Sequence, residues 1–79
     1  MRHLIVYSRR GCHLCEDLLE GLEPLCRGRA TIEVRDVDTR PEWAEAYGEL
    51  VPVLIANDQE VCRYHLDQSA LRAVLESPP

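Results

Sequence analysis

The sequence has no lysine: all nine of its basic residues are arginines, and only Arg9 and Arg10 are adjacent. Its 14 acidic residues give a formal net charge of −5. Nucleic acid and anionic membrane surfaces bind positive charge, so an acidic chain without a larger basic cluster suits neither. We therefore expect no nucleic acid and no membrane among its partners.

Long hydrophobic runs are also absent. The apolar run after Arg2-His3 ends within a few residues at Ser8, too short for the core of a signal peptide or for a membrane span. We therefore expect a cytoplasmic protein. The 79 residues predict one domain, residues 1–79, because a chain this short buries only roughly 60% of its unfolded surface and cannot supply a second core. We expect it to be a monomer.

The first half of the chain alternates short apolar runs with helical spacing. His3–Tyr7 is apolar on both alternating faces, which predicts a central strand covered on both sides. Leucines then recur at positions 14, 18, 19, 22 and 25, the spacing of one helical face, which predicts a helix beginning near Cys12. Pro24 should end or kink this helix, and Arg27-Gly28-Arg29 should form the turn that follows.

Next comes a strand and a short helix. The range Ala30–Val37 alternates, with Ile32 and Val34 on one face, which predicts an edge strand with its other face exposed. The segment Thr39-Arg40-Pro41-Glu42 has the pattern of a capping box with proline in the first turn, which predicts a helix start. The buried side of this helix should consist of Trp43, Ala46 and Tyr47, and Gly48 should end it.

The last third of the chain predicts a hairpin and a helix. Val51–Ala56 is apolar on both faces and predicts a second central strand, whereas Glu60–Tyr64 alternates and predicts an edge strand. Between them, Asn57-Asp58 is a two-residue hairpin turn. Asp67 is a good N-cap for the last helix, with Leu66 and Leu71 placed as a hydrophobic staple.

The predicted fold is therefore α/β, with elements in the order β-α-β-α-β-β-α. Placing the two doubly apolar strands in the middle gives a four-stranded mixed sheet in the order 2-1-3-4, flanked by helices. A right-handed β-α-β crossover puts the N-terminus of the first helix at the carboxyl end of the first strand. Reactive groups collect at such ends of a sheet.

Two cysteines, Cys12 and Cys15, stand at this junction of strand and helix. At a helix N-terminus, unpaired backbone N–H groups and the helix dipole stabilise a thiolate, so the pKa of Cys12 should lie below the ordinary value of about 8.5. Cys15 lies about one turn further in. The pattern predicts a redox dithiol in which Cys12 attacks a disulfide and Cys15 resolves the mixed disulfide.

A secreted disulfide framework or a metal site would also use several cysteines. We expect Cys26 and Cys62 instead to be small buried or half-buried apolar side chains. In a straight helix Cys15 and Cys26 would lie about 16 Å apart, too far to share a zinc ion with bonds near ~2.3 Å. A metal would need ligands from elsewhere, such as His65 or a second chain, so we expect no metal site.

The stretch Tyr7–Cys15, the dipeptide Val51-Pro52 and the helix beginning at Asp67 together resemble the thioredoxin-like superfamily, and in particular small glutaredoxin-like proteins. The resemblance covers nearly the whole chain. It implies a thioredoxin-like fold, thiol–disulfide oxidoreductase activity and a cis peptide bond at Val51-Pro52. It also implies that the Val51 backbone pairs with a bound thiol compound or peptide, and that Pro52, which has no N–H, packs beside the disulfide.

Two single residues match positions that bind glutathione in glutaredoxins. Arg9 matches the basic residue that holds a glutathione carboxylate, and Asp67 matches the acid that meets its amino group; the alternatives are a solvated turn charge and a helix cap. Tyr64-His65 stands where glutaredoxins usually have Gly-Gly, and Leu50 stands where they usually have Thr. Electrons therefore come either from glutathione or, as the missing Gly-Gly favours, from a flavin reductase.

His13 replaces the proline common between the two cysteines of such sites. A histidine beside the attacking sulfur stabilises the thiolate and makes the disulfide a stronger oxidant, unless His13 is only an exposed first-turn residue. The expected reaction is reduction of protein disulfides or glutathione mixed disulfides, with no bound cofactor. The alternative is a redox-sensing or partner-binding module that changes affinity without multiple turnover.

Overall fold

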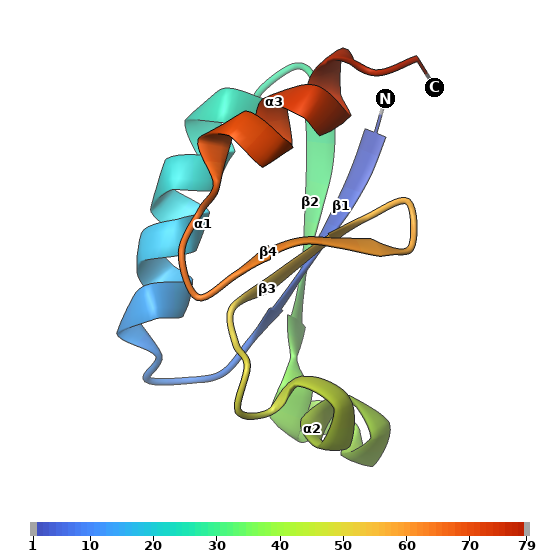
Figure 1. Ribbon diagram of the computed structural model, residues 1–79. Helices are drawn as coiled ribbons and strands as arrows, with labels where there is room; N and C mark the ends of the chain where they lie inside the picture. Colours follow the sequence, from blue (N-terminus) through green and yellow to red (C-terminus); the bar gives the residue numbers. More distant parts are fainter. Residues whose placement is uncertain (1, 79) are drawn as a thin grey trace.

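The computed structural model describes residues 2–78 and has the predicted order of strands and helices. The elements are β1 (Arg2–Ser8), α1 (His13–Cys26), β2 (Ala30–Asp36), the 3₁₀ turn η1 (Val37–Thr39), α2 (Pro41–Tyr47), β3 (Val53–Ala56), β4 (Gln59–Arg63) and α3 (Gln68–Glu76). Figure 1 shows their arrangement, with α1 and α3 beside the sheet and α2 at one end.

The four strands form one mixed sheet in the order β2-β1-β3-β4, as the sequence predicts. β1 pairs in parallel with β2, and β3 pairs antiparallel with both β1 and β4. The doubly apolar strands are therefore the central ones. Tyr7 near the end of β1 faces Val53 at the start of β3, so the segments that follow β1 and precede β3 lie at the same end of the sheet.

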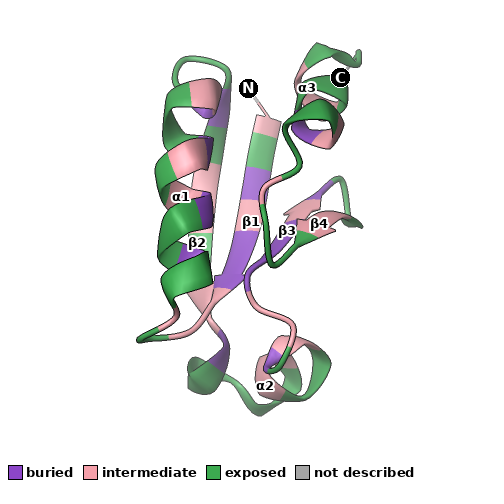
Figure 2. Ribbon diagram, turned by 60° about the vertical axis from the view of Figure 1, so that its left-hand side comes forward, coloured by how far each residue is buried: buried purple, intermediate pink, exposed green. Residues whose placement is uncertain are grey.

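The main core lies between the sheet and helices α1 and α3. It includes Leu4, Val6 and Leu54 from the central strands and Leu18, Leu22, Cys26 and Leu71 from the two helices. In Figure 2 the buried residues run along β1 and the inner side of α1. Burying this continuous apolar surface orients α1 and so fixes its first turn at the carboxyl end of β1.

A smaller core lies on the opposite face, under α2. Tyr7 and Val53 are buried there, and the Tyr7 ring stacks on Tyr47 with centroids 4.1 Å apart. The Trp43 ring meets Tyr7 edge to face at 5.8 Å. This aromatic cluster packs α2 against the end of β1 that leads into the cysteine loop.

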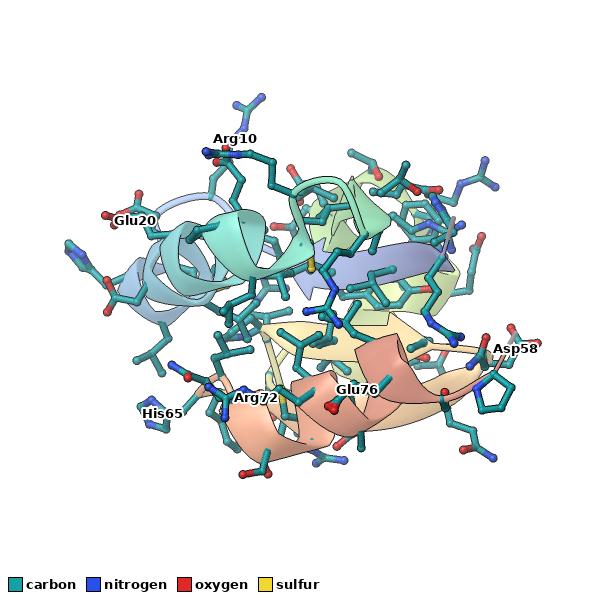
Figure 3. All side chains as sticks on the ribbon, turned by 90° about the horizontal axis from the view of Figure 1, so that it is seen from above. Arg10, Glu20, Asp58, His65, Arg72 and Glu76 are labelled. Carbon is teal, nitrogen blue, oxygen red and sulfur yellow. A yellow bond between two sulfur atoms is a disulfide. The ribbon has the colours of Figure 1, made fainter. Side chains whose placement is uncertain are left out.

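The sequence predicts that α1 ends or kinks at Pro24. The helix does not end there but continues to Cys26. Pro24 lies on the exposed side of the helix, so water can bond the Glu20 carbonyl that loses its donor. Glu20 itself points away from the sheet in Figure 3. Burial of Leu22 and Cys26 on either side of the proline favours continuing the helix. The turn at residues 27–29 forms as predicted.

The predicted start of α2 is also wrong in detail. Its N-cap is Arg40, which makes no side-chain capping bond, and the Thr39 hydroxyl instead donates to the Asp36 carbonyl at 2.7 Å. The 3₁₀ turn therefore uses the threonine that the capping-box pattern assigns to the helix. Ala46 is exposed rather than buried, whereas Trp43 and Tyr47 are half-buried as expected, and the helix ends before Gly48.

One residue of the edge strand β2, Val34, is more exposed than predicted. Val34 pairs with the fully buried Val6, yet its own side chain is 53% exposed, because β2 is the outermost strand and has no neighbour beyond it. The hairpin and last helix match expectation: Asn57 and Asp58 both have positive φ, and Asp67 caps α3. Within residues 2–78, no helix has the length and apolar character needed to cross a membrane.

Candidate redox site

Cys12 and Cys15 form a disulfide at the start of α1, with their Cα atoms 5.2 Å apart. Cys12 is the N-cap of the helix, and its extended backbone follows Gly11, whose φ of +74° turns the chain out of the loop after β1. Glycine adopts this left-handed conformation without steric cost. The sequence thus places the dithiol where a strand ends and a helix begins.

The two sulfurs differ in their surroundings. Cys12 is half-buried at the helix end, whereas Cys15 lies in the first turn and is only 1% exposed. The Cys15 backbone N–H donates to Cys12 Sγ at 3.1 Å, so the sulfur accepts a bond from one of the otherwise unpaired helix donors. In the reduced protein this donor and the helix dipole favour a thiolate on Cys12.

The Val51-Pro52 peptide bond is cis, as the resemblance implies, and Pro52 is buried. It directly precedes β3, at the end of the sheet that also carries the cysteine loop. The Pro52 carbonyl accepts a hydrogen bond from the Tyr64 N–H at 2.8 Å, which ties the end of β4 to this loop. The half-buried Val51 and the segment beginning at Tyr64 therefore flank the same region.

Arg9 is half-buried and is bonded to two other segments of the protein. Its guanidinium forms a two-point pair with the Asp38 carboxylate, at 3.1 Å for each contact, and donates to the Gly48 carbonyl at 2.9 Å. A Cβ at Gly48 would lie only 3.0 Å from the guanidinium, so glycine permits this close approach. Arg9 thereby connects the loop after β1 to η1 and to the end of α2.

Arg10 and His13 contrast with Arg9, because both extend into solvent. The side chains are 96% and 95% exposed; Arg10 lies 4.0 Å from Asp36, and His13 Nδ1 lies 3.8 Å from Glu16. Figure 3 shows Arg10 pointing outward from the fold. His13 is the first residue of α1 and lies next to Cys12 in the chain, so any effect on the sulfur acts through solvent-exposed charge.

Asp67 is a helix cap, since its carboxylate accepts the Ala70 N–H at 3.0 Å. Tyr64, three residues earlier, has a φ of +65°, which an L side chain adopts only with strain. The Tyr64 side chain is nevertheless 38% exposed, and His65 points into solvent in Figure 3. Of the two residues at the place where glutaredoxins usually have Gly-Gly, Tyr64 therefore has a glycine-like backbone, and both place side chains on the surface.

The remaining cysteines lie apart from the disulfide. Cys26 is buried in the main core and Cys62 is half-buried against it, as the sequence predicts. Burial raises the pKa of both thiols; for Cys26 the nearby Arg29 partly opposes this effect. Among residues 2–78, no three cysteine, histidine or acidic side chains are grouped so as to hold a metal ion.

A hollow of about 690 Å³ lies away from the Cys12–Cys15 disulfide, at the amino end of β1, where Arg2, His3 and Ile55 contribute to its lining. The fold brings Cys12, Cys15 and the Val51-Pro52 loop to one end of the sheet. Arg9 and Asp67 form hydrogen bonds to other groups of the protein. The sequence does not predict the partner of Arg9, because Asp38 lies 29 positions away and no local pattern pairs the two residues.

Comparisons with known proteins agree with this architecture. Residues 3–76 match the family model of the glutaredoxin-like domain (DUF836). A protein of Nitrosomonas europaea with a solution NMR structure is 39% identical, covers 91% of this chain and 88% of its own, and superimposes with a TM-score of 0.81. An X-ray structure from X. campestris is 32% identical over 96% of this chain and 99% of that one, with a TM-score of 0.74.

A more distant comparison identifies the fold. Thioredoxin from Fasciola hepatica is 22% identical, with 94% of this chain and 77% of the thioredoxin covered, and its TM-score is 0.61. The arrangement of strands and helices is therefore thioredoxin-like. A search of curated proteins found no match.

Proposed function

The chain belongs to the glutaredoxin-like (DUF836) family of the thioredoxin-like superfamily, and we therefore propose that it is a cytoplasmic thiol–disulfide oxidoreductase. The observation that carries the proposal is the pair at the start of α1, with Cys12 accepting the Cys15 N–H and Cys15 buried behind it. This arrangement provides one accessible, stabilised thiolate and one resolving thiol.

The reaction begins with the reduced pair. The Cys12 thiolate attacks one sulfur of a substrate disulfide, forms a mixed disulfide and releases the first substrate thiolate. Cys15 then loses its proton and attacks Cys12 Sγ, which releases the second substrate thiolate and forms the Cys12–Cys15 disulfide. Two electrons pass to the substrate, and glutathione or the dithiol of a flavin reductase returns them to the pair.

The neighbouring residues have supporting roles in this proposal. The Val51 backbone pairs with the substrate beside the attacked sulfur, and buried Pro52 offers no N–H that would compete there. His13 adjusts the stability of the Cys12 thiolate. Arg9 and Asp67 act by positioning the loop after β1 and the start of α3, through the contacts that they already make.

Turnover tests the proposal and distinguishes an enzyme from a redox sensor. The protein is incubated with insulin in excess, as a disulfide substrate, and with dithiothreitol as the reductant. We expect insulin to be reduced faster than by dithiothreitol alone, by more than one equivalent per protein and at a rate that scales with protein concentration. Cys12→Ser should remove this acceleration, whereas Cys62→Ser should keep it. Oxidation of one equivalent of protein without further turnover would contradict the enzyme and favour the sensor.

A further inference from the structure

Two exposed apolar side chains lie near the dithiol. Within residues 2–78 the large apolar side chains that are exposed are Leu14, Val34 and Tyr64. Leu14 stands between the two cysteines in the chain, and Tyr64 is bonded through its N–H to the carbonyl of Pro52. Their exposure at the reactive end of the protein requires an explanation, because neither contributes to the cores.

The fold directs Leu14 toward the segment that contains Tyr64. Leu14 is seven residues before Gly21 and so lies on the same face of α1. That face packs closely on the segment between β4 and α3, because a Cβ at Gly21 would lie 3.2 Å from Leu66 Cδ2. Figure 1 shows this segment running alongside α1. Leu14 and Tyr64 therefore lie on the two sides of one surface beside Cys12.

The strained backbone conformation of Tyr64 indicates a functional role for its side chain. Its φ of +65° is easy for glycine and strained for tyrosine, yet the residue is 38% exposed and belongs to neither core. Strained residues of this kind collect at binding sites. An exposed aromatic ring next to a docking backbone gives apolar contact area to a ligand at small entropic cost.

Charge disfavours a small anionic substrate at this surface. Glu16 and Asp17 follow the cysteines on the exposed side of α1, and Asp36 and Asp38 lie beside Arg10 and Arg9 on the other side. The Arg9 guanidinium is already bonded to Asp38 and Gly48. Glutathione carries two carboxylates and one ammonium group, so it would bring net negative charge to a site with more carboxylates than arginines.

We propose that Leu14 and Tyr64 form a docking surface for the apolar side chain next to a cysteine in a disulfide-bonded polypeptide, and that such disulfides are preferred over glutathione. The inference rests on the proposed function and specifies its substrate class. Electrons follow the same course: the polypeptide disulfide is reduced to two thiols, the Cys12–Cys15 pair is oxidised, and a dithiol reductant restores it.

Single-turnover rates with three probes test the proposal. The reduced protein reacts with a neutral disulfide-bonded peptide carrying Leu beside its cysteine, with the same peptide carrying Ser there, and with oxidised glutathione. Acid quenching, alkylation and mass spectrometry follow oxidation of Cys12 and Cys15. We expect the Leu peptide to react about tenfold faster than the Ser peptide, as for one apolar side chain gaining a binding surface, and glutathione to be slowest.

Variants assign the preference to the surface. Leu14→Ser and Tyr64→Gly should each remove most of the Leu-over-Ser ratio, whereas Val34→Ser, at the opposite edge of the sheet, should keep it. Glycine suits the φ of residue 64, so Tyr64→Gly should stay folded, which thermal melting verifies. Equal rates for all probes would overturn the docking surface alone; oxidation by none of them would overturn the proposed function as well.

Discussion

The backbone N–H of Cys15 donates to Cys12 Sγ across 3.1 Å, so in the proposed reaction the resolving residue would also stabilise the attacking sulfur. This bond exists because Cys12 is the N-cap of α1 and Cys15 is the third residue of the helix, whose N–H has no partner within the helix. The position of the dithiol in the chain therefore determines the asymmetry between its two sulfurs.

His13 should adjust the acidity of Cys12. In His13→Pro we expect the pKa of the Cys12 thiol to rise and the pair to become more reducing, because an imidazole that can carry positive charge beside the thiolate is lost. Proline is tolerated at the first position of a helix, so α1 should remain intact. Thiolate absorbance across a pH titration measures the change, and His13→Gln separates the charge from the backbone effect. Identical titration curves in all three proteins would refute this role.

Cys26 and Cys62 should react more slowly than Cys12. Burial raises the pKa of both thiols, which keeps them protonated at neutral pH and shields them from reagents. Brief treatment of the reduced, folded protein with iodoacetamide should therefore modify Cys12 first, as peptide mass spectrometry can show. In urea all four cysteines should react at similar rates. Equally fast modification of Cys62 in the folded protein would be inconsistent with its raised pKa.

The Glu33 carboxyl should titrate below its ordinary range. Hydrogen bonds from Arg35, and secondarily from His3, lower the pKa of Glu33. Because the pKa is lower in the folded protein, this pair stabilises the fold above the unfolded pKa and ceases to do so as pH falls through the folded value. In Arg35→Met, carboxyl NMR should show the pKa of Glu33 rising. The pKa of Glu60, lowered by Arg63, should stay unchanged as the control.

Arg9 should contribute to stability mainly through the Gly48 carbonyl. Its pair with Asp38 is exposed and should be worth less than about 1 kcal/mol. Removing the guanidinium also leaves the carbonyl of buried Gly48 without this donor, so Arg9→Met should lower the free energy of unfolding by about 1–2 kcal/mol. Urea unfolding measures this change. If Asp38→Asn costs as much as Arg9→Met, the carbonyl bond is not the main contribution.

The sequence predicts the fold well where hydrophobic periodicity is strong. The central position of β1 and β3 follows from their doubly apolar runs. The start of α1 next to its N-cap Cys12 follows from the leucine spacing. The errors occur where two local rules compete. Pro24 disfavours the helix, but its exposed position lets burial of Leu22 and Cys26 prevail.

The site is predictable to a lesser degree, because its contacts join distant segments. The Cys12–Cys15 pair is a local pattern, whereas the bond from Arg9 to Gly48 connects residues 39 positions apart and has no local signal. The resemblance to glutaredoxins does indicate that Tyr64 stands where they usually have a glycine. Its left-handed backbone and exposed ring become evident only once β4 and the Val51-Pro52 loop are in place.

The most direct test of the proposed function is the redox equilibrium of the Cys12–Cys15 pair. The protein is equilibrated in glutathione buffers of graded potential, and alkylation with mass spectrometry counts which cysteines remain free. We expect a reversible transition of Cys12 and Cys15 together, with Cys26 and Cys62 free throughout. If Cys12 and Cys15 stayed free across the whole range, the pair would not be a working dithiol, and the proposed function would be wrong.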